Sequence, residues 1–169
     1  MDLPADVIQG KDMEETVMAT AVPAASRAGP DPTKLSAVAQ LLRSAPLVVV
    51  GKGAAYAQAE TSIRRLVDQT NIPFLPTPMG KGVLSDFHPS NTSPVHSTAL
   101  KGADVVLILG ARLDWILHFG DEPKWNSGVK LIQVDISAEE IGKNNGDAGL
   151  DIVGDINVVV PQLAAALQD

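Results

Sequence analysis

Four polar side chains in this sequence each follow a short apolar run, and together they favour a nucleotide ligand. Lys52 lies in a Gly-Lys-Gly turn after "LVVV", and Arg112 comes shortly after "VVLIL". Both cations can form charge-assisted hydrogen bonds with a pyrophosphate. Asp135 follows "LIQV" and can accept two hydrogen bonds from a ribose diol. Asp155 follows "DIVG" and, with the backbone of Ile156, can face an adenine edge.

Gly51 and Gly53 flank Lys52, and we expect them to serve the same ligand. Glycines let backbone amides approach a phosphate, and the N-terminus of a following helix adds the positive end of its dipole. The usual dinucleotide fingerprint is incomplete, because Tyr56 stands at its third glycine position. The second expected strand ends in "FLPTP" without the acidic residue of that fingerprint. An NAD-binding domain is therefore the weakest alternative.

A purely structural interpretation stays open. The two glycines can simply permit a tight turn, and Arg112 can pair with Asp135 or Asp114 in a domain that binds nothing. Each residue alone is compatible with that interpretation. The nucleotide hypothesis depends on the joint placement of four polar groups at four strand ends, because ligands of open parallel sheets bind beyond those ends.

Strands and helices alternate along the chain and would position these residues. Apolar runs predict five strands, over residues 47–50, 72–77, 104–110, 130–136 and 150–155. Apolar periodicity predicts four helices, over residues 33–45, 57–70, 94–101 and 157–167. Thr33 is the expected N-cap of the first helix, and Pro46 is expected to stop it. This alternation predicts a doubly wound α/β fold, with a mainly parallel sheet of five or six strands and helices on both faces.

Composition excludes several kinds of function. The net charge of −7 argues against nucleic-acid binding, and the absence of cysteine excludes disulfides and thiol nucleophiles. His88, His96 and His118 lack the spacing of a metal site, so we expect no protein-bound metal. No apolar run approaches the roughly 20 residues of a membrane span, and the chain carries no visible targeting signal.

Four longer blocks carry a family resemblance. These are "GKGAAYAQAE", "IPFLPTPMGKGVLSDFHP", "ADVVLILGARLDWILHFG" and "LIQVDISAEEIG". They resemble the central domain of the thiamine-diphosphate-dependent 2-hydroxyacyl-CoA lyases and oxalyl-CoA decarboxylases, from about Leu35 to the C-terminus. The opening "DLPADV" resembles the last strand of the pyrimidine-binding domain that precedes the linker in these enzymes. We therefore expect residues 1–33 to be the end of a preceding domain and a linker, and residues 34–169 to be the central domain.

For the full-length parent, the resemblance implies cleavage of a 2-hydroxyacyl-CoA to formyl-CoA and an aldehyde, with oxalyl-CoA decarboxylation as the alternative. It implies thiamine diphosphate and magnesium as cofactors, and the pyrimidine- and diphosphate-binding domains and an acyl-CoA as partners. It also implies a homo-oligomer, located in the peroxisome and serving fatty acid α-oxidation if eukaryotic, and otherwise cytoplasmic. The chain lacks a Gly-Asp-Gly motif followed by an asparagine for the magnesium site, so we expect it not to be catalytic alone.

The resemblance also implies ligand contacts within this chain. ADP would contact Lys52, Arg112, Asp135 and either Asp155 or Ile156, together with an arginine that precedes Met1 in the family. A domain that has kept no ligand is the alternative.

CoA would contact residues in the third predicted helix, over residues 94–101, namely Val95, His96, Ser97 and Thr98. At His96 the family usually has arginine, and a mostly neutral histidine cannot offer a bidentate fork. Asp114 is a second departure, because relatives tend to carry asparagine there.

Overall fold

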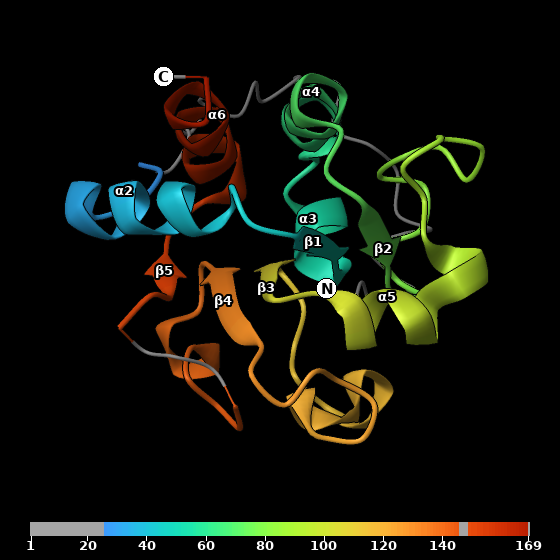
Figure 1. Cartoon of the computed structure of the whole chain (residues 1–169). Coiled ribbons are helices and arrows are strands. Elements are labelled where there is room, and N and C mark those ends of the chain that lie inside the picture. The colour runs from blue at the N-terminus through green and yellow to red at the C-terminus, as the bar shows by residue number, and fades with distance from the viewer. Residues whose placement is uncertain (1–25, 146–148, 169) are drawn as a thin grey trace, which may run out of the picture.

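Five parallel strands form one sheet in the computed structural model, which describes residues 26–145 and 149–168 (Figure 1). The strands are β1 (Pro46–Val50), β2 (Phe74–Pro76), β3 (Val105–Leu109), β4 (Lys130–Asp135) and β5 (Ile152–Val153), in the spatial order β2-β1-β3-β4-β5. All neighbouring pairs run parallel. The predicted doubly wound α/β fold is confirmed. The domain boundary at residue 33 stays a prediction, because residues 1–25 lie outside the described part.

Helices cover both faces of the sheet (Figure 1). The helices α2 (Pro32–Leu41), α4 (Glu60–Thr70) and α6 (Ile156–Ala166) lie on one face. On the other face lie α5 (His96–Gly102) and the 3₁₀ segment η2 (Trp115–Gly120). Three short elements complete the described chain, namely α3 (Lys52–Tyr56), η1 (Ser93–Val95) and η3 (Ala138–Glu140). No helix in the described residues is long and apolar enough to cross a membrane.

The central strands are apolar on both sides because both faces are covered. In β1, Val48 and Val50 pack into the layer beneath α4 and α6, whereas Leu47 and Val49 pack into the layer that contains α5. Every residue of β3 is buried. This burial explains why these strands read as continuous apolar runs rather than as alternating patterns.

The ends of two helices differ from the sequence predictions. Asp31, not Thr33, caps α2, and its Oδ1 accepts from the amides of Thr33 at 2.8 Å and Lys34 at 3.4 Å. Thr33 is the second residue of the helix. Pro32 takes the first helical position, where its missing N–H costs nothing. Pro46 does not stop this helix, which ends at Leu41, but begins β1.

The helix predicted over residues 57–70 is shorter than expected. It begins at Glu60, and the five-residue α3 precedes it. Gln58 lies between the two helices and has a φ of 51°, a left-handed conformation that interrupts a right-handed helix. The chain therefore leaves β1 through a tight helical turn before α4 starts.

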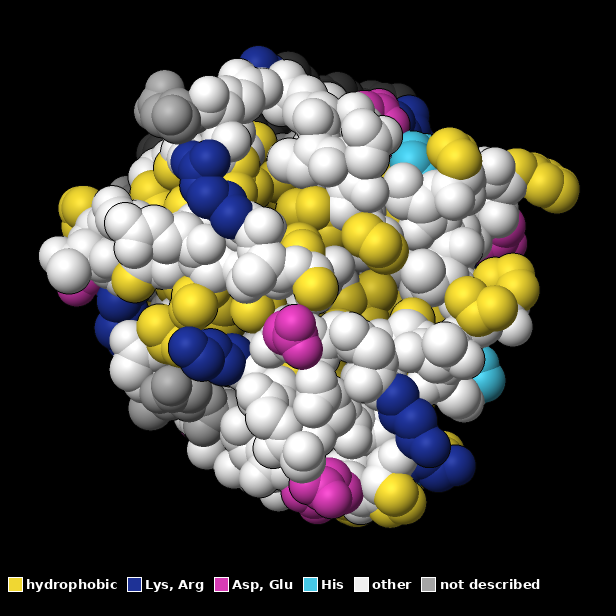
Figure 2. All heavy atoms as spheres, in the orientation of Figure 1, with side chains coloured by type: hydrophobic (Ala, Val, Ile, Leu, Met, Phe, Trp, Pro, Cys, Tyr) yellow, Lys and Arg dark blue, Asp and Glu magenta, His cyan; other side chains and the backbone are white. Residues whose placement is uncertain are grey.

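Lys and Arg side chains are scattered as separate groups on the face of the molecule that Figure 2 shows. They do not gather into a continuous basic patch on that face. Together with the net charge of −7, this dispersion gives that face no cationic surface of the kind that nucleic-acid binding needs.

The strand order reverses at β1. From β1 the chain forms β2 on one side and then crosses to β3 on the other, so the loops after β1 and β3 leave the sheet in different directions. In open α/β sheets such a reversal leaves a crevice at the carboxyl ends of the two strands, where ligands bind.

Glycines let the loops after β1 and β3 touch at this reversal. Gly110 has a φ of +61°, and a Cβ placed on it would lie 2.7 Å from both the amide nitrogen of Ala54 and the Cα of Gly53. A Cβ on Gly53 would lie 2.8 Å from the Cα of Gly110. Any larger residue would force the two strand ends apart.

We expect Gly110→Ala to lower the free energy of unfolding by roughly 2–5 kcal/mol, because it adds overpacking to left-handed strain. The control is Gly82→Ala, since Gly82 also has a positive φ, of 90°, but no atom within 4 Å of an added Cβ. The control should lose only about 1–2 kcal/mol. Urea unfolding of both variants measures the difference, and equal losses would show that the backbone contact does not constrain the fold.

Candidate functional site

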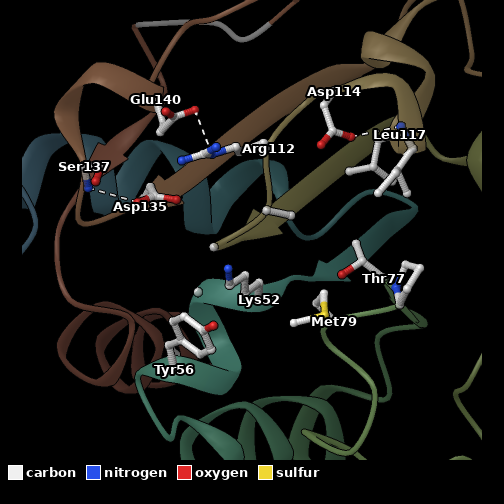
Figure 3. Close-up of a pocket in the computed structure, with 15 residues that line it drawn as sticks. Lys52, Tyr56, Thr77, Met79, Arg112, Asp114, Leu117, Asp135, Ser137 and Glu140 are labelled. Carbon is white, nitrogen blue, oxygen red and sulfur yellow. Dashed lines mark hydrogen bonds and ion pairs between the residues drawn. The ribbon is translucent and has the colours of Figure 1, made fainter. Parts of the chain in front are cut away.

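A pocket of about 450 Å³ opens where the strand order reverses, at the carboxyl ends of β1, β3 and β4 (Figure 3). Its volume is typical of small-molecule sites. Lys52 and Gly53 line it from the turn after β1, Arg112 from the loop after β3, and Asp135 from the end of β4. The structure therefore brings these four predicted residues together, and their role in binding stays a prediction.

Arg112 pairs with a residue that the sequence interpretation did not include. Its Nε lies 3.3 Å from Oε2 of Glu140, at the end of η3 (Figure 3). The other carboxylate oxygen of Glu140 lies 2.9 Å from Nζ of Lys143. Among the described residues, Arg112 forms no ion pair with Asp135 or Asp114, the two partners that the structural interpretation offered. The only signal for Glu140 in the sequence was the acidic pair Glu139 and Glu140 after β4.

Lys52 rests against an aromatic ring at the edge of the pocket. Its Nζ lies 4.8 Å from the ring centroid of Tyr56, a distance typical of a cation–π interaction. Tyr56 also lines the pocket, although the sequence marked it only as a departure from the dinucleotide fingerprint. Because its side chain is 73% exposed, the ring presents an open face to solvent.

The carboxylate of Asp135 is oriented by its own turn. Its Oδ1 accepts a hydrogen bond of 2.9 Å from the amide of Ser137. Within the described residues Oδ2 accepts none, so one oxygen remains available to a ligand. Asp114 is used in a similar way, because its Oδ1 accepts from the amide of Ile116 at 2.9 Å and caps η2.

The backbone amides of Gly51 and Gly53 already have partners. Gly51 donates to the carbonyl of Leu109 at 2.9 Å, and Gly53 donates to the carbonyl of Gly110 at 2.8 Å. Within the described residues both amides thus have a protein acceptor, and a contact of these glycines with a phosphate stays a prediction. The helix that follows also has only five residues, so few peptide dipoles add at its N-terminus. The glycines serve close packing, and the side chain of Lys52 carries the charge.

Asp155 and Ile156 do not line the pocket. Asp155 caps α6, because its Oδ1 accepts from the amide of Asn157 at 2.8 Å, and its Oδ2 lies 3.5 Å from Nε of Arg27. The side chain of Ile156 is 4% exposed and belongs to the core. The structure thus gives Asp155 a capping role that the sequence did not predict, while an adenine contact stays a prediction.

The residues predicted to contact CoA lie elsewhere. Val95 ends η1, and His96, Ser97 and Thr98 form the first turn of α5, outside the lining of the pocket. All four are exposed, and Nε2 of His96 lies 3.1 Å from Oγ of Ser97. Their proposed role therefore belongs to a different surface from that of the nucleotide.

His88 has a structural setting among the described residues. Its Nε2 lies 3.0 Å from Oδ1 of Asp68, and its ring meets Phe74 edge-on at 5.5 Å. In the part of the chain that the structure describes, no three His, Asp or Glu side chains are grouped so that they could hold a metal ion.

Comparison with known proteins identifies the family. Residues 35–163 match the family model described as the central domain of thiamine pyrophosphate enzymes. The chain belongs to this family. Its match covers the whole sheet and the pocket, because every strand lies within those residues.

Three similar proteins are named as a lyase or a decarboxylase of an acyl-CoA compound. The chain is 54% identical to mouse 2-hydroxyacyl-CoA lyase 1 over 129 residues, which cover 75% of the chain and 22% of the mouse protein. It is 44% identical to the rice 2-hydroxyacyl-CoA lyase over 182 aligned residues, covering all of the chain and 31% of the relative. It is 37% identical to oxalyl-CoA decarboxylase of Escherichia coli K12, covering 99% of the chain and 30% of the relative. The chain thus spans less than a third of these relatives.

A solved structure supports the fold. An X-ray structure of a Mycobacterium smegmatis enzyme that was assigned as thiamin-diphosphate-dependent superposes with a TM-score of 0.68. The match covers 89% of this chain and 31% of that one, at 20% sequence identity.

We expect Asp155→Ala to lower the free energy of unfolding by about 1 kcal/mol, because it removes the cap of α6. Asp155→Asn is the matched control, since asparagine caps equally well and loses only the ion pair with Arg27, whose side chain is 60% exposed. Thermal or urea unfolding compares the two variants. An equal loss in both would assign the stabilisation to the ion pair instead of the cap.

Proposed function

We propose that this chain is the ADP-binding central domain of a thiamine-diphosphate-dependent 2-hydroxyacyl-CoA lyase. The proposal is based on the placement of two cations and one carboxylate around a single pocket, at the point where the strand order reverses. One oxygen of that carboxylate already accepts a hydrogen bond from the protein. Lys52 and Arg112 line it from adjacent loops, and Asp135 lines it from the next strand end. The identity of up to 54% to proteins named 2-hydroxyacyl-CoA lyase supports the parent activity.

The arrangement suggests how ADP would lie. Figure 3 shows Lys52 and Arg112 pointing into the same space from opposite sides, with Asp135 beside them. A diphosphate between the two cations would receive charge-assisted hydrogen bonds from both. The ribose would then reach Asp135, whose unused Oδ2 can accept from a hydroxyl. Tyr56 offers an exposed ring at the same edge.

In the parent, this domain would position the two domains that hold thiamine diphosphate and Mg²⁺, and the parent would release formyl-CoA and an aldehyde. Oxalyl-CoA decarboxylation is the second candidate, favoured by the relative that is 37% identical over almost the whole chain. Val95, His96, Ser97 and Thr98 would contact the CoA portion in either case. The parent would be a homo-oligomer, peroxisomal and part of fatty acid α-oxidation if the organism is eukaryotic.

A structural domain without a ligand is the remaining candidate. The observation that favours it is the ion pair between Arg112 and Glu140, which already gives the guanidinium a partner at 3.3 Å. Under this hypothesis ADP would not raise the melting temperature, whereas any ligand that binds only the folded state must raise it.

We expect isothermal titration calorimetry to show ADP binding that Arg112→Ala and Asp135→Ala each weaken. Loss of one charge-assisted hydrogen bond corresponds to roughly 1.5–3 kcal/mol, or about tenfold or more in affinity. Arg65→Ala is the control, because Arg65 is exposed on α4 and lies outside the pocket. Tight binding that both pocket variants leave unchanged would contradict the site, and no binding together with no thermal shift would favour the structural domain.

We expect the full-length parent, assayed with thiamine diphosphate and Mg²⁺, to form formyl-CoA from a 2-hydroxyacyl-CoA. Both reactions give formyl-CoA, so the co-product distinguishes the two candidates. Cleavage of a 2-hydroxyacyl-CoA releases an aldehyde, which mass spectrometry detects, whereas decarboxylation of oxalyl-CoA releases CO₂. Turnover of oxalyl-CoA alone would select the second candidate.

A further inference from the structure

Glu140 is an acidic residue in a pocket proposed to bind an anion. Its side chain is only 16% exposed, whereas that of Arg112 is 71% exposed. A carboxylate this close to a phosphate site repels the ligand, unless its contact with Arg112 serves the binding of that ligand. The contacts around Glu140 point to the second role.

Hydrogen bonds fix the segment that carries Glu140 to the rest of the domain. The side chain of Gln133, which is 2% exposed within β4, accepts from the amide of Gly142 at 3.0 Å. The side-chain amide of Asn144 donates to the carbonyl of Leu113 at 2.6 Å. Leu113 is the residue after Arg112. Glu140 and Arg112 therefore sit on two segments that are tied together independently of their own ion pair.

Lys143 holds the carboxylate itself. It contacts one oxygen of Glu140 at 2.9 Å and leaves the other for Arg112. The two cations therefore contact different oxygens of the same carboxylate.

The ion pair with Arg112 brings Oε2 of Glu140 within 3.3 Å of Nε. A guanidinium presents its fork to a phosphate through its donors, and a partner on Nε leaves the two terminal nitrogens for that task. An arginine that is largely exposed would otherwise sample many rotamers, and ordering it on binding would weaken affinity.

We propose that Glu140 is a positioning residue that holds Arg112 through Nε, so that its terminal nitrogens are pre-oriented toward the phosphates of the nucleotide. This inference rests on the proposed function. It predicts that the hydrogen-bond acceptor at position 140 matters separately from its charge.

Two variants separate acceptor from charge. Glu140→Gln removes the negative charge but keeps an oxygen that can accept from Nε, whereas Glu140→Ala removes both. Any relief of repulsion toward ADP is therefore common to the two variants, and so is the release of Lys143. The difference between them reports the positioning of Arg112.

We expect Glu140→Ala to bind ADP about two- to tenfold more weakly than Glu140→Gln, the range for ordering one long side chain. The same pair of substitutions in an Arg112→Ala background should show no difference, because the side chain to be positioned is gone. Calorimetry up to millimolar ADP measures all four proteins beside the wild type. Equal affinities of the two single variants, or a difference that persists without Arg112, would overturn the proposal.

A second measurement needs no nucleotide. The Nε–H resonance of Arg112, assigned in ¹⁵N NMR spectra by its loss in Arg112→Ala, should exchange slowly with solvent in the wild type and faster in Glu140→Ala, with Glu140→Gln between them. If ADP does not bind the wild type, the proposed function fails, and this readout still decides the inference. Equal exchange in the wild type and in Glu140→Ala would then show that Glu140 does not position Arg112.

Discussion

The contact between the turn after β1 and the loop after β3 is the constraint on which the rest of the structure depends. Gly51, Gly53 and Gly110 meet backbone to backbone, and a Cβ on Gly51 would lie 2.3 Å from the carbonyl oxygen of Gly110. Because no side chains separate them, the amides of the first turn bond directly to the end of β3. This contact closes the bottom of the crevice and fixes the distance between the loops that carry Lys52 and Arg112.

Above that backbone contact, each cation of the pocket lies against a neighbouring side chain. Lys52 lies against the ring of Tyr56, and Arg112 lies against Glu140, which Lys143 also holds. Each cation thus contacts a side chain that also lines the pocket. A cation already held by a neighbour loses less conformational entropy on binding an anion than a free side chain does. The same arrangement keeps two like charges in one pocket without direct contact.

The fold followed from the sequence because the central strands are apolar on both faces, and only a sheet covered on both faces buries "LVVV" and "VVLIL" completely. The N-cap of α2 could not be predicted in the same way, because Asp31 and Thr33 are both good capping residues. Only the position of Pro32 decides between them. The common position of Lys52, Arg112 and Asp135 at one pocket could be predicted, because strand ends can be read from apolar runs. The position of Glu140 could not be predicted. It depends on the hydrogen bond from the amide of Gly142 to the side chain of Gln133, which joins residues nine apart across an irregular loop.

The balance of charge in the pocket bears on which ligand the proposed site would select. The pocket is lined by two cations and by three carboxylates, namely Asp114, Asp135 and Glu140, so a simple anion gains two attractions and meets three repulsions. Two of these carboxylates each accept from a backbone amide, and the third is held between two cations, which reduces but does not remove the repulsion. A ligand that also carries a diol turns Asp135 from a repelling group into an acceptor. In the proposed nucleotide site, selectivity would therefore depend on Asp135 more than on the cations, because its carboxylate would favour a ribose-bearing anion over phosphate alone.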